Sequence, residues 1–330
     1  MSEVVMTDFR RVHYSYARFA LLEALRIANV NEGDSVLLPD FICRDVLAPV
    51  HALRAIPVFY GVDRTLQPLL PKQHMSARAI IGVNYFGFPQ QLGDLQHLAS
   101  QTGATLIEDN AHGYLSCDDN GTVLGQRTGL GFTSFRKTLR VLNGAFLDVD
   151  IQAFPRGAQL VEPPTSTSRL PAGHQVRRVV GALQRVSGLP MLNIAREVIR
   201  AARNARGRPA IPQSNESETV MPSDSSIHES SLTVLSAINA QRESDRRRSL
   251  YQMVAERLQA AQYSLVFASL PRDVVPWCVP FTCSTDDLHR ARRALRGLGV
   301  EIFQWPDLPQ LVRGRTPEFY SQIYLVSMMI

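Results

Sequence analysis

Strand-like and helix-like segments alternate along the first 150 residues, and this alternation restricts the fold more than any other feature. Apolar residues recur at helical spacing over residues 18–30, 45–55 and 89–103. Short apolar segments typical of buried strands lie at residues 32–39, 56–63, 77–87, 104–110, 121–125, 131–135 and 144–150. Because helices connect neighbouring parallel strands, the alternation predicts an α/β fold with a large, mostly parallel mixed sheet between helices.

The second half of the chain has a different pattern. Two arginine-studded helices are predicted within residues 172–204, and a long helix at about 231–261. Residues 207–231 are rich in Ser, Pro and Asn, a composition typical of a loop or linker. Further strands are predicted at residues 263–267, 275–283 and 300–306.

A last helix is predicted over residues 285–299, with Thr285 as its N-cap and Asp286 and Asp287 in its first turn. We therefore expect a large domain, a helical extension, a Ser/Pro-rich loop or linker, and a smaller C-terminal α+β domain. The expected boundaries are residues 1–150, 151–206, 207–230 and 231–330.

Charge and composition narrow the class of protein. The 330 residues carry a formal charge of +5, which leaves anionic partners open. Aromatic residues are not interleaved with basic ones, so small anions are favoured over nucleic acid. No apolar run has the length of a membrane span and no signal sequence is recognisable, so we expect a cytoplasmic protein without a membrane span. The four cysteines show no metal-ligand spacing, and no metal is expected.

Lysine is almost absent from this chain. Of its 35 basic residues only Lys72 and Lys137 are lysine, and the others are arginine. A guanidinium stays protonated at any working pH, whereas a desolvated lysine amine loses its proton and can attack a carbonyl. Lys137, which follows the strand predicted at 131–135, is therefore a candidate nucleophile.

Other reactive side chains follow the predicted strands. Asp109 ends the strand at 104–110, His112 comes three residues later, and Ser134 precedes Lys137. In open α/β sheets, ligands bind beyond the carboxyl ends of the strands. A carboxylate, an imidazole and a nucleophilic amine at that edge are part of what a pyridoxal 5'-phosphate (PLP) enzyme needs.

The start of the helix predicted at 18–30 completes this set. Ala17 and Arg18 lie where free backbone N–H groups favour a phosphate. The 5′-phosphate of PLP requires such an anion site, so PLP is the expected cofactor.

Four segments together resemble a known family, the DegT-type sugar aminotransferases, which have the aspartate-aminotransferase fold (fold type I). They are "GDSVLLPDFICRDVLAPVHALRAIPVFYGVD", "IIGVNYFGFPQQLGDLQHLASQTGATLIEDNAHG", "SFRKTLRVLNGA" and "VPWCVPFTCSTDDLHRARRALRGLGVEIFQWP". The resemblance covers most of the chain, and it implies that residues 1–150 form the cofactor-binding domain.

The resemblance also implies roles for individual residues. Lys137 would bind PLP covalently, Asp109 would pair with the pyridinium nitrogen, and His112 would contact the ring face or the phenolic oxygen. The phosphate would be bound by Ser134, Ala17 and Arg18.

Among the departures from the family pattern are Cys43, the missing "NxR" segment, and Ser134, which lies only three residues before Lys137 and so nearer to it than in the best-known members. Cys43 stands where many members have an aromatic residue that stacks on the cofactor, and Tyr85 or Phe86 is expected to compensate. The "NxR" segment through which members contact the partner subunit is not recognisable in "DSSIHESSL".

The function that the resemblance implies is a PLP-dependent transaminase. It would transfer an amino group from glutamate to a nucleotide-linked keto sugar in polysaccharide or antibiotic-sugar synthesis. A homodimer is expected, with Ala17–Arg18 and residues 213–231 near the subunit seam. Two alternatives stay open, a PLP enzyme of another reaction type and a catalytically silent binding or scaffold protein. A nucleic-acid-binding protein is the weakest alternative.

Overall fold

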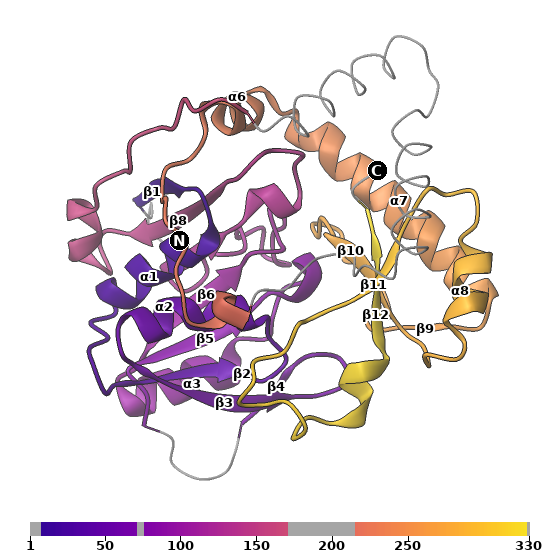
Figure 1. Ribbon diagram of the computed structural model, residues 1–330, viewed down its shortest axis with the longest axis horizontal. Helices are drawn as coiled ribbons and strands as arrows, with labels where there is room; N and C mark the ends of the chain where they lie inside the picture. The colour runs from indigo at the N-terminus through magenta and orange to yellow at the C-terminus, as the bar shows by residue number, and fades with distance from the viewer. Residues whose placement is uncertain (1–7, 71–75, 171–214, 329–330) are drawn as a thin grey trace, which may run out of the picture.

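The computed structural model describes residues 8–70, 76–170 and 215–328, and its largest element is an eight-stranded sheet (Figure 1). The strands of this sheet are β1 (Phe9–Tyr14), β2 (Ser35–Pro39), β3 (Ile56–Val62), β4 (Pro68–Leu69), β5 (Ala79–Val83), β6 (Thr105–Asn110), β7 (Leu130–Thr133) and β8 (Ala145–Asp150). Their order across the sheet is β1-β8-β7-β6-β5-β2-β3-β4.

The central strands of this sheet are parallel. β3, β2, β5, β6 and β7 run in one direction, whereas β1 and β8, β8 and β7, and β3 and β4 pair antiparallel. Every residue of β5 is buried, as expected for a strand covered on both faces. The predicted α/β fold with a mostly parallel mixed sheet is confirmed, although the sequence analysis missed the edge strand β1.

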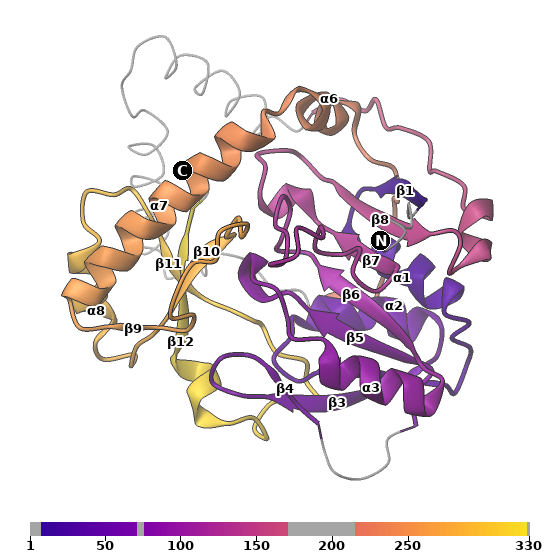
Figure 2. The ribbon, with the colours of Figure 1, turned by 180° about the vertical axis from the view of Figure 1, so that it is seen from behind.

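Helices cover both faces of the sheet. α1 (Ala17–Ile27) and α2 (Leu47–Ala52) lie on one face, and α3 (Gly93–Thr102) lies on the other, as a comparison of Figures 1 and 2 shows. Single 3₁₀ turns follow several strands, at η1 (Arg44–Val46), η2 (Tyr85–Gly87), η3 (Phe135–Lys137) and η4 (Pro155–Gln159).

A smaller antiparallel sheet lies in the C-terminal part of the structure, residues 215–328. Its strand order is β11-β12-β10-β9. Its strands are β9 (Ser264–Leu265), β10 (Cys278–Thr282), β11 (Ile302–Gln304) and β12 (Ile323–Ser327). The helices of this part are α6 (Glu229–Ala237), α7 (Ala240–Ala260) and α8 (Leu288–Ala294), with 3₁₀ turns η5 (Asn215–Glu218) and η6 (Glu318–Gln322). The long helix α7 packs against β9 and β10 (Figure 1).

The helix predicted at 231–261 is two helices. Ile238 adopts an extended conformation after α6, and the side chain of Asn239 accepts a hydrogen bond from Arg242 N–H at the start of α7. An asparagine that caps a new helix is a local stop signal, which the apolar spacing did not reveal.

Two other local predictions are wrong. Thr285 does not cap a helix, because its hydroxyl contacts Tyr324 Oη at 3.2 Å and α8 begins only after Asp287. Residues 121–125 form no strand and contribute one isolated bridge, between Cys117 and Val123. The helices predicted within residues 172–204 lie outside the described residues, and the four-part division of the chain stays a prediction.

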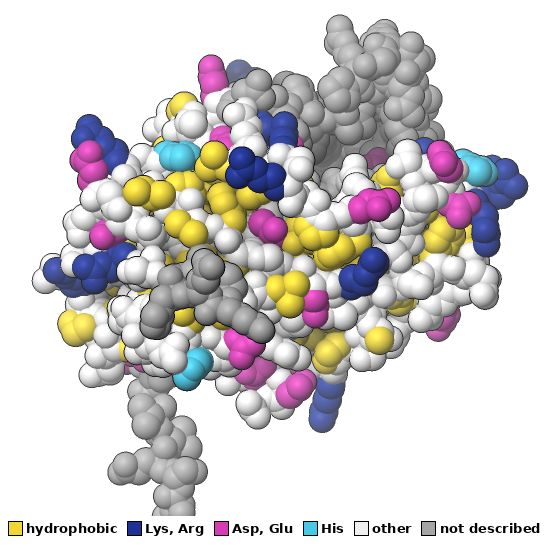
Figure 3. All heavy atoms as spheres, turned by 90° about the horizontal axis from the view of Figure 1, so that it is seen from below, with side chains coloured by type: hydrophobic (Ala, Val, Ile, Leu, Met, Phe, Trp, Pro, Cys, Tyr) yellow, Lys and Arg dark blue, Asp and Glu magenta, His cyan; other side chains and the backbone are white. Residues whose placement is uncertain are grey.

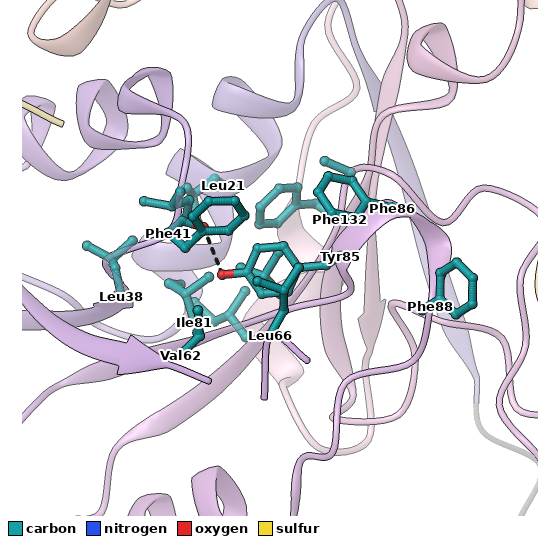
Figure 4. Close-up of a cluster of buried hydrophobic side chains, with 14 of the residues drawn as sticks. Leu21, Leu38, Phe41, Val62, Leu66, Ile81, Tyr85, Phe86, Phe88 and Phe132 are labelled. Carbon is teal, nitrogen blue, oxygen red and sulfur yellow. Dashed lines mark hydrogen bonds between the residues drawn. The ribbon is translucent and has the colours of Figure 1, made fainter. Parts of the chain in front are cut away.

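The core is continuous from the large sheet into the C-terminal part. Figure 4 shows part of it, in which Phe41 and Tyr85 pack together above Val62 and Ile81. The Tyr85 hydroxyl donates a hydrogen bond of 2.8 Å to the backbone carbonyl of Phe41, so the polar end of this buried ring is satisfied.

Polar contacts also join the C-terminal part to the loop after β2. Nε of the buried Arg44 lies 3.0 Å from Oδ2 of Asp307, and the Tyr320 hydroxyl donates to Asp40 Oδ1 at 2.5 Å. The loop that contains Cys43 is therefore fixed from both sides.

Arg247 on α7 is fully buried and ties three segments together. Its Nε donates to Glu243 at 2.8 Å, its Nη1 donates to the Pro276 carbonyl at 3.2 Å, and its Nη2 donates to the Thr138 carbonyl. Since Thr138 follows Lys137, this guanidinium connects α7 directly to the loop that carries the candidate nucleophile.

Gly87 lies where two chain segments come unusually close. Its φ is +96°, and a Cβ there would lie 2.7 Å from the Val275 carbonyl oxygen and 3.3 Å from that of His112. Gly103, at the end of α3, also has a positive φ, of +71°, but a Cβ there would meet nothing within 4 Å.

Gly87→Ala is expected to destabilise the protein more than Gly103→Ala. Both substitutions place alanine in a left-handed conformation, at a cost of about 1–2 kcal/mol. Gly87→Ala must also displace backbone, which should add about 1–3 kcal/mol. Urea unfolding of both variants measures the difference, and equal losses of free energy would contradict the close approach at Gly87.

Candidate active site

Strand β6 presents two neighbouring carboxylates to opposite faces of the sheet. Successive side chains of a strand point to opposite sides, so Glu108 and Asp109 diverge. Glu108 accepts hydrogen bonds from Asn84 Nδ2 at 2.8 Å and from Arg127 Nε at 2.8 Å. Glu108 therefore forms a buried structural ion pair with Arg127 and is not part of the site.

Asp109 is buried, and among the described residues no such cation is bonded to it. One of its oxygens accepts the Ala111 N–H at 2.8 Å. Burial raises the pKa of Asp109 to about 6, against the opposing effects of the Lys137 charge and the Ala111 N–H. A carboxylate held in this costly state is typical of a functional site.

Lys137 and His112 are in direct contact. Lys137 lies in the turn η3, just after β7, and its Nζ is 2.9 Å from His112 Nε2. Burial lowers the pKa of Lys137, and burial together with the Lys137 charge holds the pKa of His112 well below its usual range. Both groups are thus biased toward their neutral forms.

Both tryptophans of the chain pack on the His112 ring. Trp277 is stacked on it, with centroids 4.3 Å apart and an interplanar angle of 5°, and Trp305 meets it edge-on at 5.0 Å. Phe86 lies nearly parallel to the imidazole at 5.7 Å. Neither tryptophan was predicted from the sequence to lie in the site, although tryptophan is rare in this chain, with two in 330 residues.

Two arginines converge at the start of α1. The guanidinium carbon of Arg136 lies 5.1 Å from the ring centroid of Tyr16, and that of Arg18 lies 5.8 Å from it. Within the described ranges, neither arginine forms an ion pair with a carboxylate, and the buried Nε of Arg136 has no hydrogen-bond partner. With the free N–H groups at Ala17, this arrangement suits a phosphate.

A pocket of ≈210 Å³ opens beside the nucleophile. It lies between η3 and the small sheet, and the residues that line it are Arg136, Lys137, Trp277, Cys278, Phe303 and Ser327. Four of the six, Trp277, Cys278, Phe303 and Ser327, come from the C-terminal part, and none of the four was predicted from the sequence to lie in the site.

The remaining predicted residues lie close by. Cys43 interacts electrostatically with Lys137, and burial raises the pKa of its thiol to about 11. Ser134 is buried directly before η3, and its carbonyl accepts the Lys137 N–H at 3.1 Å. Tyr85 packs beneath the loop of Cys43, with its hydroxyl bonded to Phe41, so its predicted cofactor contact would be made by the ring and not by the hydroxyl.

These residues fit PLP. In the described part of the chain no cation is bonded to the buried carboxylate of Asp109, and a pyridinium N–H would supply one. Arg136 has an orphaned buried donor, which a phosphate oxygen would satisfy. Within the described residues, no group of three or more His, Cys, Asp or Glu side chains could bind a metal, and no helix has the length and apolar character to cross a bilayer.

Comparison with known proteins bears on the family and the fold. Residues 12–144 match the model of the DegT/DnrJ/EryC1/StrS aminotransferase family. A UDP-N-acetyl-3-dehydro-alpha-D-glucosamine 3-aminotransferase from Acidithiobacillus ferrooxidans is 31% identical over 121 residues, which are 35% of this chain. The aligned part is about a third of that relative, 32% of its length.

Solved structures share the fold over nearly the whole chain. Helicobacter pylori PseC, an aminotransferase of pseudaminic acid biosynthesis, has a TM-score of 0.64 at 12% identity over 96% of this chain and 81% of its own. Escherichia coli GDP-4-keto-6-deoxy-D-mannose-3-dehydratase with bound hydrated PLP has a TM-score of 0.59 at 13% identity over 96% and 82%. The predicted fold is confirmed, and the match over residues 12–144 agrees with the resemblance to the DegT-type family.

Asp109→Asn is expected to stabilise the cofactor-free protein in a pH-dependent way. Because folding raises the pKa of Asp109 from 3.8 to about 6, the folded state binds this proton more tightly. The free energy of unfolding of the wild type therefore falls as the pH rises through this window, by about 2–3 kcal/mol. Asparagine removes that loss, so the variant should gain on the wild type between about pH 4 and pH 8.

Urea unfolding at both pH values measures this gain, with Glu108→Gln as the matched control. Glu108 is paired with Arg127, so its substitution should cost stability at pH 8. A gain for Asp109→Asn that is the same at both pH values would show that Asp109 is not held ionised at a cost.

Proposed function

We propose that this chain, whose residues 12–144 match the DegT/DnrJ/EryC1/StrS aminotransferase family, is a PLP-dependent aminotransferase. It takes an amino group from an amino donor, glutamate, and transfers it to a nucleotide-linked keto sugar in the synthesis of a polysaccharide or an antibiotic sugar. The observation that carries the proposal is the assembly of Lys137, His112 and Asp109 in one buried site.

Bound PLP supplies an aldehyde and a pyridine ring that withdraws electrons from the substrate carbon. Lys137 provides the amine that binds that aldehyde and, once released, carries a proton at Nζ. Asp109 accepts the N–H of the ring nitrogen and so keeps the ring protonated. His112 lies against Nζ and orients it.

The phosphate end is held by positive charge and backbone. Arg18 and Arg136 supply guanidinium donors beside Tyr16, and Ala17 supplies a helix-start N–H. Trp277 and Phe303 line the side of the pocket opposite the large sheet, where they exclude water from the amine.

The sugar assignment is supported by the aligned relative, whose name describes an aminotransferase of a UDP-linked sugar. The formal charge of +5 suits a nucleotide diphosphate, although basic and acidic side chains are interspersed on the face in Figure 3. Attraction of an anionic substrate therefore depends on local arginines such as Arg18 and Arg136 and not on a broad basic surface there. All four cysteines are free thiols, which agrees with the proposed cytoplasmic location.

The scaffold alternative is less well supported. An ionised Asp109 in the interior and a desolvated Lys137 both lower the stability of the fold. In a protein that has lost catalysis, selection would not maintain these destabilising features. The presence of both costs favours an active enzyme.

Borohydride reduction of the PLP-loaded protein should attach the cofactor irreversibly to Lys137. Peptide mapping identifies the site, and the chain offers a matched pair of variants because it has only two lysines. Lys137→Arg should abolish labelling and transamination, since a guanidinium is not nucleophilic, and Lys72→Arg should leave both unchanged. A label on Lys72, or none on loaded protein, would refute the proposed function.

The proposal includes a homodimer with a seam beside β1. Ser15, at the end of β1, bonds through its N–H to Ser225 at 2.8 Å and through its hydroxyl to Asp224 at 2.6 Å. The two segments expected at the seam are therefore adjacent within one chain. Val161, which is 83% exposed, borders a pocket of ≈390 Å³ on this side, lined in part by Tyr14.

Val161→Asp is expected to weaken the dimer. An exposed apolar residue at a seam becomes a buried charge after substitution, which should raise the dissociation constant about tenfold or more. Leu69→Asp is the control, because Leu69 is 55% exposed on β4, at the opposite edge of the sheet. Sedimentation velocity measures both, and a wild type that sediments as a monomer while turning over substrate would contradict the dimer.

A further inference from the structure

His112 makes two hydrogen bonds, one through each ring nitrogen. The backbone N–H of Phe86 lies against Nδ1 at 3.4 Å, and Lys137 Nζ lies against Nε2 at 2.9 Å. The first bond has a fixed direction because a backbone N–H can only donate. Nδ1 is therefore the acceptor and carries no proton.

The direction of the first bond determines that of the second. A neutral imidazole carries one proton, so with Nδ1 bare the proton is on Nε2. Nε2 then donates to Lys137 Nζ, and the nitrogen that accepts must have a lone pair. An ammonium group has none, so the two bonds together are compatible only with an uncharged lysine.

The imidazolium form is excluded by the surroundings of the ring. It would place a second N–H against that of Phe86, and it would be a charge buried between aromatic residues. Trp277 covers one face and Trp305 lies against the edge, so water does not compensate. The lowered pKa of His112 agrees with this exclusion.

Other groups near Lys137 act in both directions. Cys43, Asp45 and Asp109 favour the ammonium form, and Arg136 and burial oppose it. The Trp277 ring, 5.6 Å from Nζ, also favours a cation. Burial is the largest of these effects and lowers the pKa of Lys137, and the hydrogen bond from His112 acts in the same direction.

We propose that His112, oriented by the Phe86 N–H, holds Lys137 as a free amine by donating its Nε2 proton to Nζ. The lysine is then a nucleophile before an aldehyde arrives, and Nζ does not have to lose a proton first. This inference deepens the proposed function, but it concerns the cofactor-free chain and is tested without PLP.

Lysine labelled with ¹³C at Cε provides the test, because the full-length chain then has only two labelled side chains. Lys72 serves as the internal reference, and Lys137→Arg assigns the signals. In the wild type the Lys137 signal should be that of a neutral amine at pH 8, while the Lys72 signal is that of an ammonium group.

Two substitutions separate the hydrogen bond from simple burial. His112→Gln keeps an N–H donor. The pH midpoint of the Lys137 titration, followed by its ¹³C signal, should therefore stay within about half a pH unit of the wild type. His112→Leu removes the donor and should raise the midpoint by about one unit, the worth of one hydrogen bond. A midpoint that is equal in the wild type and His112→Leu, or an ammonium signal for Lys137 in the wild type at pH 8, would overturn the proposal.

A second measurement observes the tautomer in the wild-type protein itself. Long-range ¹H–¹⁵N correlation of the wild-type imidazoles distinguishes a ring protonated on Nε2 from one protonated on Nδ1, with His112→Gln used only for assignment. His112 should be protonated on Nε2, and protonation on Nδ1 would refute the proposed hydrogen bond from Nε2 to Lys137 Nζ. If the lysine is neutral but borohydride leaves PLP unattached, the proposed function fails while this inference stands.

Discussion

The parallel register of β5, β6 and β7 is the constraint on which the site depends. Asp109 pairs with Phe132 of β7, so both strands end at the same edge of the sheet. The loops that follow them carry His112 and Lys137, and the loop after β5 brings the Phe86 N–H to the same place. If β7 ran antiparallel to β6, as β8 does to β7, Lys137 would lie at the other edge of the sheet, far from Asp109.

Buried charges in this protein divide into two groups. Structural ones are paired, as with Arg127 and Glu108, or bonded to carbonyls, as with Arg247. Those of the site, Asp109 and the Nε of Arg136, have no such partner in the described structure. An unpaired buried polar group destabilises the folded state. In this protein such groups lie where a ligand of complementary charge can pair with them and offset that destabilisation.

Sequence patterns predicted the features that are determined by residues close together along the chain. The parallel strands and the residues at their ends, such as Asp109 and Lys137, follow from short apolar segments and what comes after them. The break between α6 and α7 was hidden because apolar spacing runs through Asn239. Trp277 was missed because its contact with His112 joins segments far apart in sequence, and no local pattern encodes such a contact.

The contacts of Arg247 limit how the two parts of this chain can be recombined in evolution. Its guanidinium holds the carbonyl next to Lys137 and the carbonyl before Trp277 from a helix of the C-terminal part. A chimera that joined this large sheet to the C-terminal part of a relative would keep every residue at the strand ends. It would nevertheless lose the support of the lysine loop unless the incoming helix carried a matching guanidinium. The two parts of the chain are therefore expected to be inherited together and not exchanged separately.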